Sequence, residues 1–553
     1  MSPLPRRWSA ALATLVLLTL VAVPSPASAE SFVAIKGAGS SWAAPAIDAW
    51  STDVHPQGIV INFTASGSAA GRQAYTLNEV DFAATDIAFL TQGDPFGGGI
   101  ENSSYAYSYI PIVAGGTALM YNLKLGNQKI TNLRLSGDTI TKIFTGKITN
   151  WSDPAITRDY GAQLPSQKIT VVTRSDGSGA SYQFTRWMSK QYTSQWNAFC
   201  SGFGVGAPCP PTEFYPKFSG SVQRQGSDQV ANYIASPSYG VGSIGYDEYA
   251  YALNNGIPVV KVLNAKGYYA LPTPSNVAIA LQKAVIDEDP TSVTFLMQNL
   301  DQVYSYDDPR TYPISSYSYL VVPRDSRLDP RGVPQGPPPA FNTDKGKTLT
   351  TWIKYVLCGA QQSAGRLGYS PLPKNLVVGG FNQMGHVPGS VPVPDTAQLT
   401  GCNNPTYSDG VNHLIAGAPQ PSPCDFHTAP LNCVVSNGQP VAAGTNAGGQ
   451  ANGSTGGGTN GGTNGGTAAA GTNPSAAAAG VDPDTGQVLT GDSGPGGGGD
   501  AAAQRLADSR RTGNSALVAL TVAELLAAMV APVLIGARLR RRRAWPEQSG
   551  GTA

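Results

Sequence analysis

The stretch from Thr170 to Phe184 constrains the fold of this chain most, because it joins a strand, a tight turn and a helix. Its β-branched start predicts a strand, a polar turn follows from Arg174 to Gly179, and residues 180–189 predict a helix. The first backbone N–H groups of a helix have no partner within it, and glycines allow close approach to the backbone. The turn therefore predicts an oxyanion site with Arg174 as a charged donor, and the alternative is an ordinary Ser or Asp helix cap.

The same unit occurs repeatedly nearer the N-terminus. A strand at 32–35 precedes a small-residue turn at 37–45 and a helix through Trp50. A second strand at 59–63 precedes the turn 66–71 and a helix from 72 to 77, and a third strand at 80–86 ends on Asp86. Alternating strands and helices predict an α/β domain whose turns converge at one edge of the sheet.

Composition and the N-terminus place the protein outside the cell. The 553 residues carry a formal net charge of +1 and only 13% charged side chains, so we expect no nucleic-acid partner. Arg6 and Arg7, the apolar run 10–23 and the small residues Ala27, Ser28 and Ala29 predict a secretory signal peptide over residues 1–29.

An exported chain with 6 cysteines is expected to form disulfides. Cys200 and Cys209 close a short loop of glycine and proline and are expected to pair. Cys402 with Cys424 is the second expected pair. No pair has the CxxC spacing of a metal site, so no metal is expected.

Four segments resemble the ligand loops of the high-affinity phosphate-binding proteins of bacterial phosphate ABC transporters. They are GAGSSWAAP (37–45), FTASGSAAGRQ (63–73), VDFAATD (80–86) and TRSDGSGAS (173–181). Segments at 136–156, 242–253, 311–322 and 367–373 extend the resemblance over about Phe32 to Pro373. The resemblance implies a two-lobed periplasmic-binding-protein fold (type II) with the ligand between the lobes. The chain would cross near 112–121 and 304–314, giving a domain over 32–376 with lobe one at 32–115 and 306–376 and lobe two at 116–305.

The resemblance also implies which residues contact phosphate. The family's hydrogen-bond donors and its acceptor match these positions of this chain: Ser41, the backbone N–H of Trp42, Ser68, Asp86, Arg174, Asp176 (which would steady the arginine), Ser178, Gly179 and Ala180. The family often has threonine where this chain has Ala180, so one hydroxyl is lost. Whether the neighbouring Ser181 replaces it is left open.

The chemistry of this set favours a protonated oxyanion. Hydroxyls, backbone N–H groups and an arginine donate hydrogen bonds, whereas the ionised carboxylate of Asp86 only accepts them. Phosphate that keeps a proton can donate to Asp86, and fully ionised sulfate cannot, so the acid is expected to reject sulfate. The alternative is that Asp86 only caps a helix.

The C-terminal third has a different composition. Residues 377–435 are rich in Pro, Gly and Asn and predict an irregular, disulfide-bearing extension, and residues 436–514 predict a low-complexity, disordered linker. The apolar run 516–537, about 33 Å long as a helix, predicts one transmembrane helix, and the arginine-rich tail 538–553 is expected to be cytoplasmic. The alternative is a soluble amphipathic helix.

Together these features predict a membrane-tethered extracellular protein that binds inorganic phosphate and hands it to ABC permease subunits. We expect no cofactor and no catalysis. One alternative is a secreted phosphatase-like enzyme, which needs a metal cluster or an activated nucleophile that the 4 histidines do not indicate. The other is a surface or sensory protein that is not coupled to transport.

Overall fold

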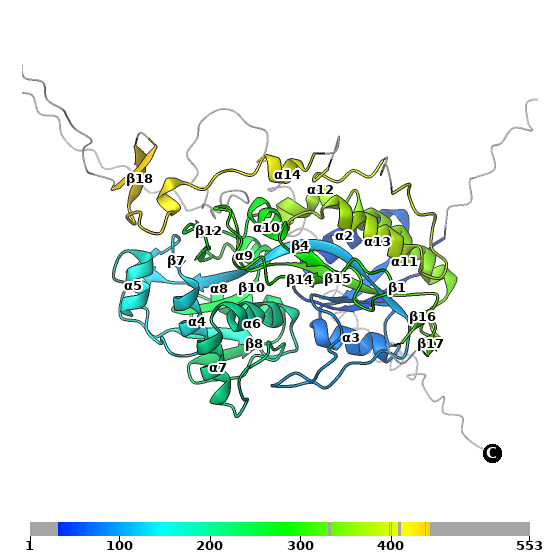
Figure 1. The fold of residues 1–553 in the computed structure, drawn as a ribbon, viewed down its shortest axis with the longest axis horizontal. Helices are drawn as coiled ribbons and strands as arrows, with labels where there is room; N and C mark the ends of the chain where they lie inside the picture. Colours follow the sequence, from blue (N-terminus) through cyan, green and yellow to red (C-terminus); the bar gives the residue numbers. More distant parts are fainter. Residues whose placement is uncertain are drawn as a thin grey trace, which may run out of the picture. The chain divides into compact units, whose positions relative to one another are not determined.

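The computed structural model describes residues 31–442 apart from 330–332, 397–398, 400, 408–410 and 437. A mixed, eight-stranded sheet runs through this part of the chain in the order β2-β1-β3-β15-β4-β10-β8-β9. Helices cover both faces of the sheet (Figure 1). The fold is therefore mixed α/β, as the alternation of strands and helices predicts.

The first half of the sheet contains three parallel strands, β1 (Ile35–Gly39), β2 (Ile61–Thr64) and β3 (Phe82–Thr85). The helices α2 (Ala44–Val54) and α3 (Ser68–Thr76) connect them. Helix α3 begins earlier than the predicted Arg72, because Gly67 turns the chain with a φ of 96°. Gly71 then packs against β1, where an added Cβ would lie 2.4 Å from the Cα of Gly39.

The strand β4 (Tyr107–Asn122) joins the two halves of the sheet. It pairs antiparallel with β15 (Ser315–Pro323) over residues 107–116 and with β10 (Ser243–Glu248) over residues 117–122. Every residue of β4 except its two end residues is buried, as expected for a central strand covered on both faces. The change of partner at Gly116 and Thr117 falls within the predicted crossing at 112–121.

The second half of the sheet contains β10 and the strands β8 (Thr170–Arg174) and β9 (Ser221–Arg224), which pair in parallel. Successive residues of β8 face opposite sides, as a strand requires. Val171 belongs to the main core, whereas Val172 packs in a smaller cluster with Val230 and Ile234. Those two side chains come from α8 (Gly226–Ala235), so α8 covers the face of the sheet opposite to the main core.

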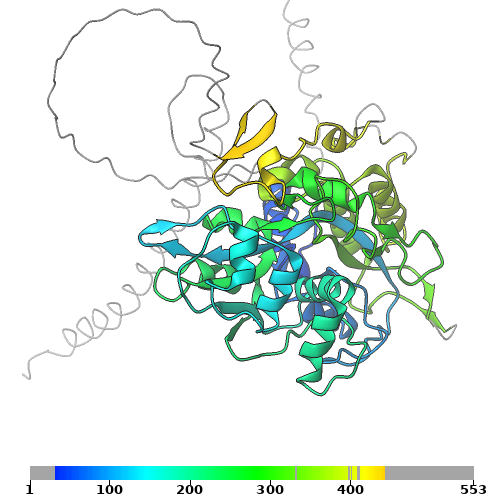
Figure 2. The same cartoon turned by 60° about the vertical axis from the view of Figure 1, so that its left-hand side comes forward.

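The other helices that surround this half are visible in Figure 2. They are α4 (Gly137–Phe144), α5 (Pro154–Tyr160), α6 (Gly179–Gln191), α7 (Thr193–Ser201), α9 (Tyr249–Asn255) and α10 (Pro274–Leu281). Short strands complete the body: β5 (Lys124–Leu125), β6 (Gln128–Lys129), β7 (Arg134–Leu135), β11 (Lys261–Leu263), β12 (Tyr269–Ala270), β13 (Val285–Ile286), β14 (Gln298–Asn299), β16 (Arg327–Leu328) and β17 (Pro334–Gln335). The single turns η1 (His55–Gln57), η2 (Gly365–Leu367) and α12 (Gln361–Ala364) connect larger elements.

The helices α11 (Thr343–Leu357) and α13 (Lys374–Met384) pack against the first half of the sheet. Helix α13 spans the predicted start of the irregular extension at 377, and its Val377, Phe381 and Met384 are buried in the core. That boundary was placed too early, because the resemblance ends at Pro373 and helix α13 follows it directly. The irregular segment begins after Met384.

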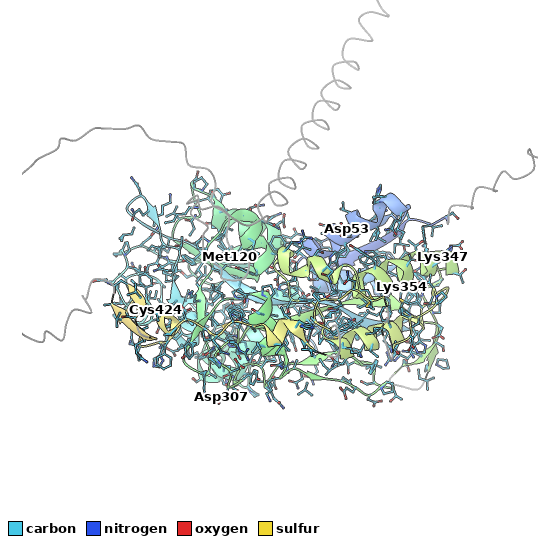
Figure 3. The ribbon with its side chains drawn as sticks, turned by 90° about the horizontal axis from the view of Figure 1, so that it is seen from above. Asp53, Met120, Asp307, Lys347, Lys354 and Cys424 are labelled. Atoms are coloured by element: carbon cyan, nitrogen blue, oxygen red, sulfur yellow. A yellow bond between two sulfur atoms is a disulfide. The ribbon has the colours of Figure 1, made fainter. Side chains whose placement is uncertain are left out.

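The extension contains α14 (His413–Ala416), the turn η3 (Pro423–Asp425) and a hairpin of β18 (Cys433–Ser436) and β19 (Gln439–Ala442). The predicted linker therefore includes a strand at its start. Figure 3 places Cys424 at the end of the described part opposite to Lys347 and Lys354 of α11. The extension is held there by the ion pair between Lys261 Nζ and Asp425 Oδ1, at 2.6 Å.

Three disulfides join the six cysteines. The predicted pair Cys200–Cys209 is confirmed. The predicted pair Cys402–Cys424 is wrong, because Cys402 bonds to Cys358 at the end of α11 and Cys424 bonds to Cys433. The first of these two ties the extension to the body, and the second closes a short loop within it.

The predicted signal peptide (1–29), most of the predicted linker, the apolar run 516–537 and the tail 538–553 lie outside the described residues. Within the described ranges, no helix combines the length and the apolar character needed to cross a membrane.

Candidate functional site

The predicted ligand-binding residues come together at the carboxyl ends of β1, β3 and β8. The register pairs Gly39 of β1 with Ala84 of β3, which places the residues after both strands side by side. Ser40 Oγ donates to Asp86 Oδ1 at 2.8 Å, and Ser68 Oγ at the start of α3 donates to Asp86 Oδ2 at 3.1 Å. The parallel order of the strands thus brings three separate turns into one buried cluster.

Arg174 at the end of β8 connects this cluster to the second half of the sheet. Its guanidinium is buried, and it donates from Nη2 to Ser41 Oγ at 2.9 Å. It also donates from Nε to Asp176 Oδ1 at 2.8 Å, and its Nη2 pairs with the other carboxylate oxygen. Asp176 therefore steadies the arginine, as the resemblance implied. Nη1 reaches Asp247 Oδ2 at 3.3 Å, a contact that the sequence did not indicate.

The two carboxylates keep Arg174 charged although it is out of water. Burial by itself disfavours the guanidinium, but Asp247 and Asp176 raise the pKa of Arg174 above its ordinary value. Burial raises the pKa of Asp176, but the charge and hydrogen bonds of Arg174 and the backbone N–H of Gly226 together lower it, so the pKa of Asp176 lies below its usual range. Burial dominates at Asp247 and raises its pKa despite Arg174.

Asp86 is fully surrounded by hydroxyl groups. Besides Ser40 and Ser68, it accepts a hydrogen bond from Ser318 Oγ at 2.7 Å. Burial raises the pKa of Asp86, and the three serines and Arg174 oppose this effect without cancelling it. Asp86 is thus a carboxylate that retains a proton more readily than an exposed one.

The helix starts supply free backbone donors beside this acid. Within the described ranges, the N–H groups of Trp42, Gly179 and Ala180 donate no hydrogen bond. Ser178 caps α6, and its Oγ accepts from the N–H of Ser181 at 3.4 Å. Unpaired N–H groups and the positive end of a helix dipole together favour an anion.

Gly179 and Ala180 allow this close packing. An added Cβ on Gly179 would lie 2.5 Å from Asp86 Oδ2, so any side chain there would displace the acid. Ala180 is buried and presents no hydroxyl. The Ser181 hydroxyl lies 2.6 Å from the hydroxyl of Tyr246, so it already has a partner away from Ala180.

A cavity of about 590 Å³ lies directly beside Asp86. Its walls include residues 87–95, Gln183 and Arg186 of α6, and residues 297–299. Gln183 Nε2 donates to the carbonyl oxygen of Asp86 at 2.9 Å and closes the boundary between cavity and cluster. The cavity therefore extends to Asp86, whose buried carboxylate is the acceptor of the cluster.

Comparison with known proteins assigns the family. The sequence model of the PBP superfamily domain matches residues 25–359, which is more than half of the 553-residue chain. The chain belongs to the PBP superfamily.

Several relatives of this PBP superfamily protein carry one name. It is 29% identical over 357 residues to the phosphate-binding protein PstS of Xylella fastidiosa, covering 64% of this chain and 86% of that protein. It is 27% identical over 328 residues to the phosphate-binding protein PstS 3 of Mycobacterium tuberculosis, covering 57% of this chain and 76% of that protein. The resemblance drawn from the four loops is confirmed, and neither name denotes an enzyme.

Solved structures were also compared. A phosphate binding protein from Stenotrophomonas maltophilia is 19% identical and covers 69% of this chain and 99% of its own, with a TM-score of 0.44. A high affinity periplasmic phosphate-binding protein bound with phosphate is 18% identical, with a TM-score of 0.45. The match covers 62% of this chain and 92% of that chain.

Four polar residues of the cluster escaped sequence reasoning in this PBP superfamily protein: Ser40, Ser227, Asp247 and Ser318. Ser227 opens α8 directly after β9, and its Oγ lies 2.7 Å from Ser41 Oγ. The sequence Gly226-Ser227-Asp228 after a strand was a fourth small-residue turn and could have revealed it. Asp247 and Ser318 lie within strands, where no local pattern marks them.

The described residues also bear on the enzyme alternative. No group of three His, Cys, Asp or Glu side chains within them is placed to hold a metal ion. Among the three histidines of the extension, His386 faces Asp325 at 3.7 Å, which is a surface contact between partly exposed side chains.

Proposed function

We propose that this protein binds inorganic phosphate at the cluster around Asp86 and Arg174. The contacts are those that the resemblance implied: Ser41, Trp42, Ser68, Asp86, Arg174, Asp176, Ser178, Gly179 and Ala180. One observation carries the proposal. A buried acceptor, Asp86, lies beside free backbone donors and a buried arginine, which suits a ligand that both accepts and donates hydrogen bonds.

The balance of charge supports phosphate over sulfate. Arg174 is the one cation of the cluster, while Asp86, Asp176 and Asp247 are buried or nearly buried acids. A ligand with two full negative charges would be repelled by these acids unless it carries protons that reduce its charge. Phosphate and arsenate bring a proton at neutral pH and sulfate does not.

We further propose that the ligand is enclosed between two lobes, 32–115 with 306–376 and 116–305. The change of partner in the middle of β4 supports the first crossing. The N–H of Thr117 donates to the carbonyl oxygen of Ile314 at 2.9 Å, so the second crossing runs beside the first. Two adjacent crossings suit a hinge, and lobe closure would bring Arg174 to Ser41.

The remaining proposals concern transport. The resemblance of the four loops to the binding proteins of phosphate ABC transporters supports delivery of phosphate to ABC permease subunits. Residues 1–29 would direct export, and the apolar run 516–537 would hold the protein in the cell membrane as a single-pass anchor, with the linker and the binding domain outside. The protein would thus be a carrier without chemistry of its own.

Calorimetry of the full chain with phosphate, arsenate and sulfate tests the binding proposal. Wild type should bind the first two at this cluster, and sulfate should not displace phosphate from it. Asp86→Asn supplies an amide donor and removes a charge, so sulfate should gain relative to phosphate. Asp81→Asn is the matched control, because Asp81 precedes the same strand but pairs with Lys345 Nζ at 2.8 Å, away from the site. Equal affinity of wild type for sulfate and phosphate would refute the role of Asp86.

A further inference from the structure

A buried arginine outside the phosphate site pairs with no carboxylate among the described residues. Within the described ranges three arginines are buried: Arg72, Arg134 and Arg174. Arg72 pairs with Glu101 and Glu213, and Arg174 pairs with two aspartates. Arg134 of β7 has no carboxylate partner among the described residues, although a buried charge is costly unless it is paired.

The hydrogen bonds of Arg134 leave part of the guanidinium unused. Nε donates to the carbonyl oxygen of Asp159 at 3.1 Å, and Nη2 donates to that of Ala429 at 2.7 Å. The guanidinium also lies over the ring of Tyr269, 5.2 Å from its centroid. Nη1 donates to no described residue. These neutral partners orient the group but do not neutralise it.

Arg134 faces a pocket of about 490 Å³ between the body and the extension. The body contributes Arg134, Arg158, Gly161 and Ala162, and the extension contributes residues 427–432. Arg158 of α5 and His427 are exposed, and Arg158 has no ion-pair partner within the described ranges. The pocket therefore combines two unneutralised arginines and a histidine.

The nearby acids are already engaged elsewhere. Asp159 Oδ2 accepts from the N–H and the Oγ of Ser136, at 2.8 and 2.7 Å. Asp425 is held by Lys261. Gly161 has a φ of 93°, and an added Cβ would lie 3.2 Å from Nη2 of Arg134, so this position keeps the floor of the pocket clear.

We propose that this pocket binds a small oxyanion, either an inorganic tetrahedral anion or an organic carboxylate. Nη1 of Arg134 and the guanidinium of Arg158 would hold it, because guanidinium groups match the geometry of both kinds of oxyanion. The bound anion would bridge α5 and the loop closed by Cys424 and Cys433. It would stabilise the docking of the extension on the body, independently of the phosphate site.

Calorimetry with sulfate and, separately, citrate tests this proposal on the full chain and distinguishes the two sources. The variants are Arg158→Ala and, as a control with the same change of charge, Arg366→Ala, an exposed residue of η2 in the other half of the protein. We expect wild type and Arg366→Ala to bind one of the anions equally and Arg158→Ala to bind it about tenfold more weakly. Phosphate binding at the cluster around Asp86 should be unchanged in both variants.

Equal titrations of Arg158→Ala and Arg366→Ala with both anions would overturn the proposal. Melting curves of Arg134→Met give a second measure. The anion that binds should raise the melting temperature of wild type and leave that of Arg134→Met unchanged, since ligands stabilise only the state that binds them. If Arg134→Met does not fold, the comparison of Arg158→Ala with Arg366→Ala still decides.

Discussion

Arg174→Ala should weaken phosphate binding and also destabilise the protein. The side chain is 1% exposed, and it donates to Ser41, Ser227 and two aspartates. Its removal takes away the one charged donor of the site. It also leaves Asp247, which is fully buried, and Asp176 without their shared cation.

The structure sets the size of both effects. Removing one partner of a buried ion pair costs about 3–5 kcal/mol, and little is lost to screening because Arg174 and Asp247 are out of water. Loss of a charged hydrogen bond to the ligand costs about 1.5–3 kcal/mol, which corresponds to at least about tenfold in affinity. Phosphate affinity and the free energy of unfolding should therefore both fall in Arg174→Ala.

The double variant Arg174→Ala/Asp247→Asn separates the two effects. Neutralising Asp247 should recover part of the free energy of unfolding but none of the phosphate affinity. Urea denaturation and calorimetry measure the two quantities. Lys190→Ala is the control, because this exposed lysine of α6 pairs with Asp301 at 3.0 Å and its loss should lower the free energy of unfolding by no more than about 1 kcal/mol.

Three results would refute this reasoning. Phosphate affinity equal to wild type in a folded Arg174→Ala protein would remove the arginine from the site. An unchanged urea midpoint in Arg174→Ala would show that the arginine does not stabilise the two buried aspartates. Recovery of affinity in the double variant would mean that the loss came from misfolding and not from a missing donor.

Four further predictions follow from the same structure. Lowering the pH should strengthen sulfate binding by wild type, because the raised pKa of Asp86 lets it become a protonated donor above the usual range of an aspartate, and calorimetry across pH measures this. Burial, Asp247 and Asp86 raise the pKa of Glu248. Its contribution to the free energy of unfolding is therefore complete below an ordinary glutamate pKa and is lost as the pH rises. Glu248→Gln should unfold at higher urea than wild type at neutral pH and lose this advantage in acid. Ala180→Thr should tighten phosphate binding in calorimetry by one hydrogen bond to a charged group, at most about 1.5–3 kcal/mol, since the Ser181 hydroxyl is occupied by Tyr246, and no change would mean that the added methyl prevents the bond. Truncation after Gly499 should release the protein into the medium with unchanged phosphate affinity, and retention on washed membranes would remove 516–537 as the anchor.

Local sequence was enough to locate the turns of the site. Strand, small-residue turn and helix are neighbours in the chain, so the positions after β1 and β8 and the start of α6 follow from composition and periodicity. The side-by-side placement of the turns after β1 and β3 then follows from parallel pairing, whereas the antiparallel strands β15, β4 and β10 lie between these strands and β8. For this reason the turns that carry Ser68 and Asp86 lie together as the pattern predicts, and Ser68 Oγ donates to Asp86 Oδ2 at 3.1 Å.

Contacts made by strands from distant parts of the chain were beyond such reasoning. Ser318 reaches Asp86 only because β15 lies next to β3 in the sheet, and Asp247 reaches Arg174 because β10 lies next to β8. The pairing of Cys402 depends in the same way on where α11 ends in space. Sequence distance carries no information on these neighbours, so spacing favoured the wrong disulfide.

The contacts between the proposed lobes show what phosphate binding has to accomplish. Arg72 of lobe one pairs with Glu213 of lobe two at 2.7 Å, and both side chains are fully buried. The N–H of Ala69 donates to the carbonyl oxygen of Gly177 at 3.1 Å across the same boundary. Separation of the lobes breaks these bonds but also returns the Arg72 and Glu213 charges to water, so the net cost of opening is smaller than the contacts alone suggest. A ligand that bridges Asp86 and Arg174 adds interactions that exist only in the closed arrangement, and this difference is what allows phosphate to shift the balance toward closure.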